Sequence, residues 1–359
     1  MCQYAGVLQI NLAAIRSNWQ FLRQSFTGAA CGSVIKANAY GLGVAPVAQA
    51  LYSEGCRDFF VATYKEGVQV KRLLPLDAQV YVLQGCRKGA ERTMIESGLI
   101  PVLSSLQMIE RWLVLPAALV KRCVIKVNSG MNRLGLSPSE FQTVLTDERL
   151  PSAGVQMLLS HMACADQPLN PLNALQLQRF QHMLSACREV LPNIRASLAN
   201  SATVFLPNQF HFDVARPGIA LFGSGHPQLA SVVSLHLPVL QVRNLSSGEA
   251  VGYGADFYAS RDMRVAIVAG GYADGIFRSL SNVAQGWFGE SLPMLGRVSM
   301  DSCVFDISSL AAEFQPQEGD LIEVLGEHRP LDKVAEEAGT ISYELLTRLG
   351  QRFERRYCE

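Results

Sequence analysis

Charge is scarce in this 359-residue chain. Asp, Glu, Lys and Arg make up 17% of the residues, against about 25% in an average globular domain. The 31 basic and 31 acidic residues cancel, so no net field would attract a nucleic acid or an anionic membrane, and we expect neither as a partner. Hydrophobic residues make up 49%, which is typical of a well-buried enzyme whose surface is partly covered by a partner subunit.

Long apolar runs are also missing. No stretch approaches the roughly 18 residues of a membrane span, and the N-terminus lacks the basic and apolar segments of an export signal. The nine cysteines, at positions 2, 31, 56, 86, 123, 164, 187, 303 and 358, are odd in number and never spaced as Cys-x-x-Cys. They indicate reduced thiols rather than a disulfide framework or a metal site. These absences predict a cytoplasmic protein without a bound metal.

Short apolar runs alternate with helical patterns through the first two thirds of the chain, which predicts βα units. The eight expected strands are Ser33–Lys36, Asp58–Ala62, Gln79–Leu83, Ile100–Leu103, Cys123–Val127, Val155–Ser160, Arg195–Leu198 and Phe212–Arg216. Helical spacing occurs at Ala45–Ser53, Tyr64–Leu74, Ser104–Leu113 and Asn173–Val190. Eight such units form either a closed barrel or an open doubly wound sheet.

Polar residues at the strand ends favour the barrel. Lys36, Lys126, His161, Asn200 and Arg216 each come at or just after the end of a different apolar strand, where a TIM-type barrel gathers its catalytic groups. We therefore predict an α/β protein with an N-terminal (β/α)8 barrel over residues 1–228.

Residues 229–359 have a different pattern, which predicts a β-rich second domain. Glycine is frequent, and short strands are expected at Val232–Leu240, Arg264–Val268, Met294–Leu295, Cys303–Ile307 and Leu321–Leu325, followed by a helix near Tyr343–Gly350. Two domains also agree with a length above the roughly 250 to 300 residues at which a single core stops growing.

Two side chains suggest nucleophilic chemistry. A lysine at a strand end that faces a dry pocket can lose its proton and form a Schiff base, although Lys36 could instead extend to the barrel rim. Cys164, three residues after His161, is a weaker candidate, because a thiol in an apolar stretch is usually buried filler.

Several segments then resemble the alanine racemase family. Val34-Ile35-Lys36-Ala37-Asn38-Ala39-Tyr40-Gly41-Leu42-Gly43 resembles the motif that carries the pyridoxal phosphate (PLP) lysine in that family. The other similar segments follow in the same order over nearly the whole chain: Lys126–Gly135, Ser160–Ala163, Ser197–Ala202, Arg216–Ile219, Gly252–Gly254, Gly271–Gly275 and Gly296–Asp301.

This resemblance implies a PLP-dependent amino-acid racemase with two bases. Lys36 would hold PLP as a Schiff base and move a proton on one face of the substrate Cα. Tyr253, from the second domain, would do so on the opposite face. Alanine is the implied substrate, with serine and other small amino acids as alternatives. D-Alanine for peptidoglycan is the implied product.

The resemblance also assigns the cofactor contacts. His161 would lie against the PLP ring and link Tyr253 to Arg216, whose guanidinium approaches the pyridine nitrogen. Arg133 would contact the phenolic oxygen and the substrate, and Asn200 would belong to the same cofactor site. The implied phosphate ligands are Tyr40, Ser201 and the backbone amides of Gly218 and Ile219.

Other implied residues concern modification and assembly. Lys126 would be carboxylated on its amine, which turns a cation into an anion that orients Arg133. Met300 and Asp301 would reach the site from a partner subunit, with the Met300 amide holding the substrate carboxylate and Tyr272 at the entrance. An obligate homodimer would follow.

The chain departs from the family pattern at three places. Leu42 replaces a common histidine, Asn128-Ser129 replaces Asp-Thr, and Gln351 stands where some members have a phosphate-contacting tyrosine, which puts cofactor affinity in doubt. Two other interpretations stay open. A related PLP decarboxylase would pair an acidic residue, not Arg216, with the pyridine nitrogen, and a non-catalytic PLP-binding protein would lack the second domain.

Overall fold

The structure, a computed structural model, describes residues 5–116 and 119–359. They form two compact units. We call Ile15–Leu221 with Gly225–Leu229 the barrel unit, and the described residues up to Ala14 with Phe222–Ser224 and Ala230–Glu359 the β unit. No described helix has the length and apolar character needed to cross a membrane.

The expected barrel domain of residues 1–228 begins too early in the sequence. Strand β1 (Val7–Asn11) pairs antiparallel with β11 (Val233–Leu245) and parallel with β19 (Glu354–Cys358). It therefore belongs to the β unit, whereas the sequence division at 228 and 229 assigned it to the barrel. Its partners lie more than 200 residues away, which local sequence patterns do not reveal.

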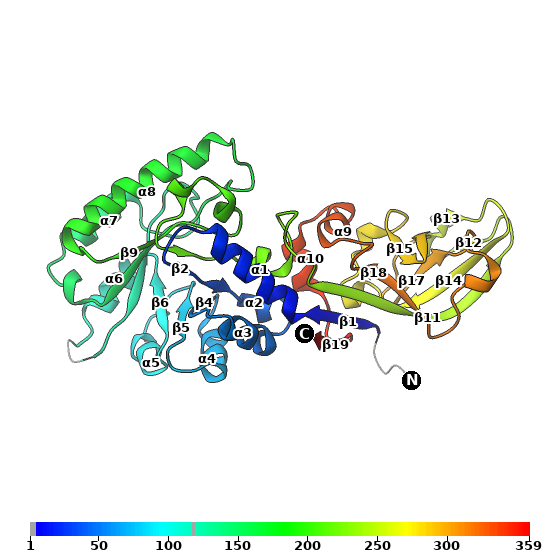
Figure 1. The fold of residues 1–359 in the computed structure, drawn as a ribbon, viewed down its shortest axis with the longest axis horizontal. Helices are drawn as coiled ribbons and strands as arrows, with labels where there is room; N and C mark the ends of the chain where they lie inside the picture. The colour runs from blue at the N-terminus through cyan, green and yellow to red at the C-terminus, as the bar shows by residue number, and fades with distance from the viewer. Residues whose placement is uncertain (1–4, 117–118) are drawn as a thin grey trace. The chain divides into compact units, whose positions relative to one another are not determined.

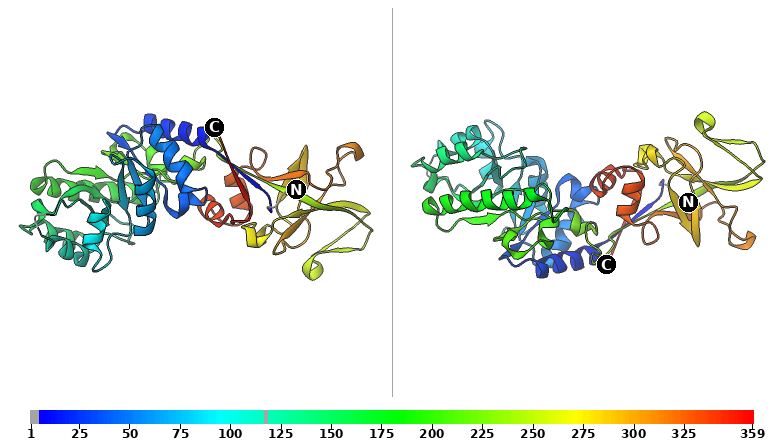
Figure 2. Two further views of the ribbon diagram at one scale, coloured as in Figure 1. Left: turned by 90° about the horizontal axis from the view of Figure 1, so that it is seen from below. Right: turned by 90° about the horizontal axis from the view of Figure 1, so that it is seen from above.

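The barrel unit is a ring of parallel strands with helices outside it (Figures 1 and 2). Its strands are β2 (Ala30–Cys31), β3 (Ser33–Val34), β4 (Asp58–Val61), β5 (Gln79–Val82), β6 (Ile100–Leu103), β7 (Cys123–Lys126), β8 (Val155–Leu159), β9 (Arg195–Ser197) and β10 (Val214–Ala215). Strands β4, β6 and β7 are buried along their whole length, as expected for parallel strands covered on both faces.

The ring closes through β10. Strands β3 to β9 pair in chain order, and β10 pairs with β2. Asp213 N and Arg216 N donate to Ala196 O and Ala199 O on one side, and Val34 N donates to Pro217 O on the other. The barrel prediction is confirmed, and β2 and β3 form one strand that is interrupted at Gly32.

The helices of this unit are α1 (Leu12–Ser25), α2 (Lys36–Tyr40), α3 (Val44–Ser53), α4 (Tyr64–Leu73), α5 (Glu91–Glu96), α6 (Leu106–Leu113), α7 (Pro138–Leu145) and α8 (Pro171–Val190). Helices α3, α4, α6 and α8 begin within two residues of a predicted helix start, and the other four were not predicted. α1 starts in the β unit, because that unit includes the chain up to Ala14. Asn170 caps α8 by accepting from Leu172 N at 3.0 Å, and Leu177, Phe180 and Leu184 bury one side of this helix in the barrel's core.

The β unit is built around the long strand β11, which pairs with β1 and β18 (Leu321–Leu325) in one stretch and with β14 (Met263–Ala269) in another. Its register shifts between Val239 and Gln241, where a bulge bends the strand. The other elements are β12 (Ala250–Val251), β13 (Phe257–Tyr258), β15 (Gln285–Phe288), β16 (Glu290–Pro293), β17 (Ser302–Asp306), α9 (Leu331–Glu337) and α10 (Ser342–Arg348). The predicted strand at Met294–Leu295 is wrong, since Met294 makes only an isolated bridge to Phe305.

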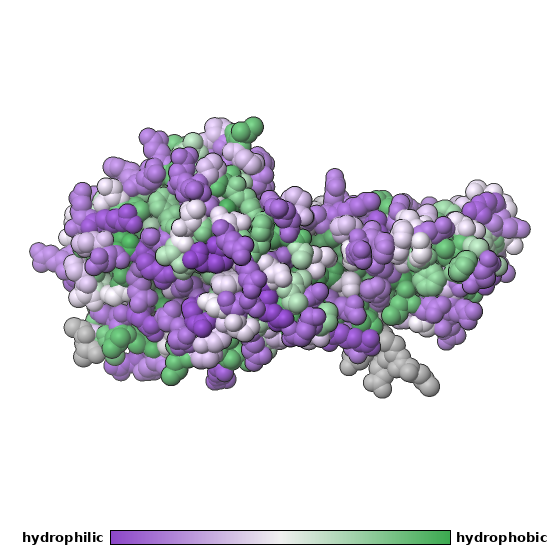
Figure 3. Space-filling model, in the orientation of Figure 1, coloured by the Kyte–Doolittle hydropathy of each residue, from purple (hydrophilic) through white to green (hydrophobic). Residues whose placement is uncertain are grey.

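Hydrophobic and hydrophilic side chains are interspersed on the face shown in Figure 3. Although charged residues are few, this face therefore has no single uniform apolar surface.

Candidate active site

Lys36 lies where the first barrel strand ends in a sharp turn. Ala37 to Tyr40 form a left-handed turn with φ between 52° and 56°, a conformation that costs a non-glycine residue roughly 1–2 kcal/mol. Ala37 N donates to Glu66 Oε1 and Asn38 Oδ1 accepts from Val44 N, both at 2.8 Å. These bonds hold a strained backbone at the position of the lysine, as is common at functional sites.

Basic side chains from several strand ends act on one another here. Burial, followed by the charge of Arg133, lowers the pKa of Lys36, and Glu66 opposes this shift. Burial, together with Arg216, Arg133 and Lys36, lowers the pKa of Lys126 to about 8. Among the described residues, Glu66 is the one carboxylate that affects the pKa of either lysine. The surplus positive charge suits an anionic ligand.

Arg216 and His161 form a buried pair. Arg216 Nη2 donates to Ser160 O at 2.7 Å and to His161 Nδ1 at 3.2 Å, and Nη1 donates to Ser197 Oγ. Because a guanidinium only donates, His161 Nδ1 must be unprotonated. Burial and then the charge of Arg216 hold the pKa of His161 well below its usual value. The ring is therefore neutral, with its proton on Nε2.

Asp213 is not the partner of Arg216. The Asp213 carboxylate accepts from Ala196 N at 2.7 Å and lies 3.7 Å from Arg188. The side chain of Arg216 turns into the barrel instead and is only 3% exposed.

The expected phosphate ligands lie together. Ser201 Oγ accepts from Gly218 N at 2.8 Å and from Ala220 N at 3.3 Å. A Cβ added to Gly218 would lie 2.2 Å from Tyr40 Oη, so only glycine allows this approach. Ile219 follows at the start of a buried turn. A hydroxyl, a phenol and backbone amides thus lie close together at Gly218, which suits an anion-binding loop.

Asn200 follows β9 and connects two strand-end segments. Its Nδ2 donates to Met162 O at 3.2 Å, and its Oδ1 accepts from Thr203 N and Thr203 Oγ1 at 3.1 and 2.9 Å. These bonds join the segments after β8 and β9.

Arg133 lies on a loop between Val127 and Leu136, which form a bridge at its base. Asn128 Oδ1 accepts from Gly130 N and from Asn132 N, both at 3.0 Å. Asn128 can accept these bonds as the aspartate usual in the family would, so the substitution leaves the loop closed. The negative charge of that aspartate, however, is absent from this chain.

The Nδ1 atom of His161 is not free to act as a base for Cys164. His161 Nδ1 already accepts from Arg216, and Cys164 contributes its backbone carbonyl to Asn173 Nδ2 at 3.1 Å.

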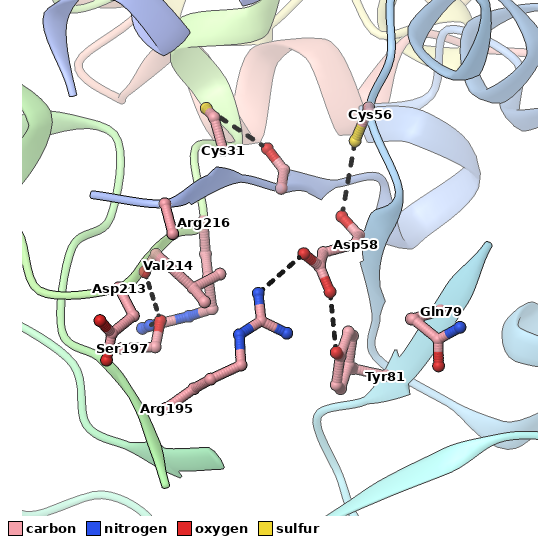
Figure 4. A network of polar contacts seen from close by, with 12 residues as sticks. Cys31, Cys56, Asp58, Gln79, Tyr81, Arg195, Ser197, Asp213, Val214 and Arg216 are labelled. Atoms are coloured by element: carbon pink, nitrogen blue, oxygen red, sulfur yellow. Dashed lines mark hydrogen bonds and ion pairs between the residues drawn. The ribbon is translucent and has the colours of Figure 1, made fainter. Parts of the chain in front are cut away.

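A second polar layer, which the sequence did not predict, lies inside the barrel. Asp58 accepts from Tyr81 Oη at 2.8 Å and from Arg195 Nη2 at 3.1 Å (Figure 4). Asp58 and Arg195 open strands β4 and β9, so they lie at the end of the barrel away from Lys36. The only sequence signal was a charge at each strand start.

In the β unit, Tyr253 lies on a tight turn and is 72% exposed. Gly252 and Gly254 flank it with φ of 70° and 75°. A Cβ on Gly254 would lie 2.7 Å from the Arg297 guanidinium carbon, and Arg297 pairs with Asp256. The turn is therefore braced, but the phenol itself is open.

Met300, Asp301 and Tyr272 come from two adjoining loops of the same unit. Tyr272 N donates to Ser299 O and Ala273 N to Met300 O, at 3.0 and 3.1 Å. Arg352 joins Asp301 Oδ1, at 2.7 Å, to the fully buried Asp274, at 2.6 Å. Met300 remains 52% exposed. Neither Arg352 nor Asp274 was singled out from the sequence.

The comparisons with known proteins agree over the full length. The sequence matches the models of the alanine racemase N-terminal domain over residues 10–226 and C-terminal domain over residues 232–357. The alanine racemases of Rhodospirillum rubrum and Brucella abortus are 44% and 41% identical, each over 98% of this chain and over 96% and 93% of their own.

Solved structures give the same result. An alanine racemase from Bartonella henselae with covalently bound PLP has a TM-score of 0.94 at 38% identity and covers 99% of both chains. The biosynthetic alanine racemase of Pseudomonas aeruginosa has a TM-score of 0.89 at 33% identity and covers 99% of this chain and 100% of its own. The chain belongs to the alanine racemase family.

Proposed function

We propose that this protein is a PLP-dependent racemase that interconverts L- and D-alanine, with Lys36 and Tyr253 as its two bases. One observation carries the proposal. The amine of Lys36, its pKa lowered by burial and Arg133, belongs to a site with surplus positive charge and a loop shaped for an anion.

The barrel residues fit PLP. Lys36 would hold it covalently, Ser201, Tyr40 and the amides of Gly218 and Ile219 would bind its phosphate, and Arg133 would bind its phenolic oxygen. Bound PLP withdraws electron density from the substrate and makes the Cα proton acidic. Asn200 acts by fixing the loop beside the phosphate ligands.

Lys36 and Tyr253 exchange protons with opposite faces of Cα. The base on one face keeps the proton that it removes, and the protonated base on the other face delivers its own, which inverts the centre. A lysine with a lowered pKa is neutral more often near neutral pH, as a base must be. His161 and Arg216 would assist Tyr253 in giving up and taking back its proton.

Arg216 would also set the electron demand at the pyridine nitrogen. Burial lowers its pKa, but a guanidinium keeps its proton under physiological conditions. Arg216 would therefore offer bound PLP a hydrogen bond without transferring a proton, which would make PLP a weaker electron sink and limit side reactions. A decarboxylase, which would place an acid there, is disfavoured because the resemblance assigns this position to Arg216.

Lys126 is the proposed site of carboxylation. Its pKa of about 8 leaves part of the amine neutral near pH 7.5. That amine can add to carbon dioxide, form an N–C bond and release one proton. The resulting carbamate would offset the positive charges of Arg133 and Arg216.

The exposed side chains of the β unit complete the site in a homodimer. Tyr253, Met300, Tyr272 and Asp301 would meet the barrel of a partner subunit, with the Met300 amide binding the substrate carboxylate. The proposed location is the cytoplasm, where D-alanine would serve peptidoglycan synthesis. Serine is a second substrate candidate, because a pocket often separates such small side chains by only about 10- to 200-fold.

A chiral assay tests the proposal. Purified protein with PLP is incubated separately with L- and D-alanine and with L- and D-serine, and the enantiomers are quantified while visible absorbance reports lysine-bound PLP. We expect racemisation of alanine from both directions and slower turnover of serine. Bound PLP without racemisation would instead support a non-catalytic PLP-binding protein.

A further inference from the structure

Gln176 reaches from an outer helix into the strand ends of the site. It lies on α8, and its side chain is fully buried. Its Nε2 donates to His161 O at 2.9 Å and to Ser129 Oγ at 3.2 Å, and its Oε1 accepts from Ala163 N at 2.8 Å. One carboxamide thus joins the loop that carries His161 to the loop that carries Arg133.

The direction of every bond in this network is determined. His161 O can only accept and Ala163 N can only donate, which fixes the two ends of the carboxamide. Ser160 Oγ donates to Val127 O at 2.9 Å, so it accepts from Ser129 Oγ at 2.8 Å, and Ser129 in turn accepts from Gln176. The donors run in one direction from the helix to the end of β7.

Arg216 holds the same segment after β8 through separate bonds, because it donates to Ser160 O and to His161 Nδ1. The backbone at Ser160 and His161 therefore has two anchors, the guanidinium on one side and the carboxamide on the other. A displacement of either anchor would tilt the neutral imidazole and shift the Arg133 loop.

We infer that Gln176 is a positioning residue for racemisation: it sets the relative placement of His161 and Arg133 without touching substrate or cofactor. The inference rests on the proposed function. A second buried amide on α8, Asn173, supports it, because its Nδ2 donates to Cys164 O and Gln167 O at 3.1 and 2.9 Å. The helix thus holds the whole segment after β8.

Gln176→Glu tests this inference while keeping the side-chain volume. A carboxylate can still accept from Ala163 N but cannot donate to His161 O or to Ser129. Gln176→Met removes all three bonds without adding a charge, and serves if the first variant does not fold. Ser129→Ala removes the bond from Gln176 to Ser129 and the bond from Ser129 to Ser160 but keeps the other two bonds of Gln176. Gln178→Glu is the matched control, since Gln178 lies on the same helix and is exposed.

Three quantities are measured: melting temperature, visible circular dichroism of bound PLP, and turnover of alanine per bound PLP. We expect Gln176→Glu to alter the dichroism and to lower turnover per cofactor roughly 10- to 100-fold, as for other lost positioning contacts. Ser129→Ala should lose a few-fold on the same scale, and Gln178→Glu should match the wild type.

A lower melting temperature with unchanged dichroism and unchanged turnover per cofactor would overturn the inference. Failure of the proposed function would be a separate result, because the wild type would then not racemise alanine. The dichroism of bound PLP would still report whether Gln176 positions His161 and Arg133.

Discussion

The two halves of the proposed site differ in how the protein holds them. In the barrel unit, Arg216 and Lys126 are 3% and 8% exposed, and burial together with neighbouring cations lowers the pKa of Lys126. In the β unit, Tyr253 and Met300 are 72% and 52% exposed, and the loops that carry them are braced. The barrel half offers an anion buried cations within one subunit, whereas the β-unit half presents exposed side chains, which under the proposal meet a partner subunit.

The barrel half therefore carries the features of a binding site, and the β-unit half carries those of an interface. Buried cations that outnumber the nearby carboxylates are costly unless an anion joins them, so the barrel half indicates an anionic ligand. Exposed aromatic and methionine side chains on rigid turns are typical of interfaces. Under the proposed mechanism, racemisation needs both halves, and each half can be disrupted separately.

Lys36→Ala should have the largest effect. It removes both the covalent hold on PLP and one base, so we expect a loss of about 10⁴-fold or more in racemisation. Borohydride reduction followed by mass analysis should no longer attach PLP to the protein. Lys65→Ala, at an exposed position, is the control. Substantial activity in Lys36→Ala would contradict the role of Lys36.

Tyr253→Phe should lower racemisation roughly 10²- to 10³-fold while PLP still binds. Because L- and D-alanine are equally stable, kcat/KM must fall equally in both directions, so the asymmetry has to be measured by isotope exchange. In deuterated water, one enantiomer should exchange its Cα hydrogen without inversion through Lys36, and the other should not. Equal exchange of both enantiomers would remove Tyr253 from its role, and Tyr258→Phe is the exposed control.

Lys126→Met should stabilise the cofactor-free protein near pH 7. The folded-state pKa of Lys126 is lowered from 10.5 to about 8, so the unfolded chain binds more protons between these values. The penalty, on the order of 3 kcal/mol, is fully present below pH 8 and disappears as pH rises toward 10.5.

The difference in unfolding free energy between this variant and the wild type, in buffer free of carbon dioxide, should therefore shrink from pH 7 to pH 10. Lys88→Met, at an exposed position, should show no such trend. Intact mass at ambient carbon dioxide should show the carbamate on wild type and not on Lys126→Met.

Arg352→Gln should have the smallest effect. It breaks the link from the buried Asp274 to Asp301 and loosens the loop that carries the Met300 amide. We expect KM for alanine to rise about 10-fold with kcat less affected, since the Met300 amide would bind the substrate carboxylate in the ground state and the transition state alike. Arg356→Gln, which breaks an exposed ion pair, should leave KM unchanged, and a pure loss of kcat would contradict the assignment.

Much of the barrel could be predicted because its order is local. Each strand is a short apolar run, and helices α3, α4, α6 and α8 follow with helical spacing. The β unit was harder, since β1, β11 and β19 find their partners hundreds of residues away. The left-handed turn after Lys36 was also missed, because Ala37 and Ala39 carry no sequence signal for positive φ.

The site residues near the strand ends could be chosen from the sequence, but their supports could not. Gln176, Asp274 and Arg352 act through contacts between distant segments, and a polar residue on a helix ordinarily predicts only an exposed face. The roles of Tyr253 and Met300 came from the family resemblance alone, since an exposed turn residue has no pattern of its own.

The most direct test of the central claim mixes two inactive subunits. Lys36→Ala and Tyr253→Phe proteins are unfolded together, refolded and assayed for alanine racemisation with PLP. If each site takes Lys36 from one subunit and Tyr253 from its partner, mixed dimers contain one intact site, and about a quarter of the wild-type activity should return. No recovery, with mixed dimers demonstrated by differential tagging, would contradict a site shared between two subunits.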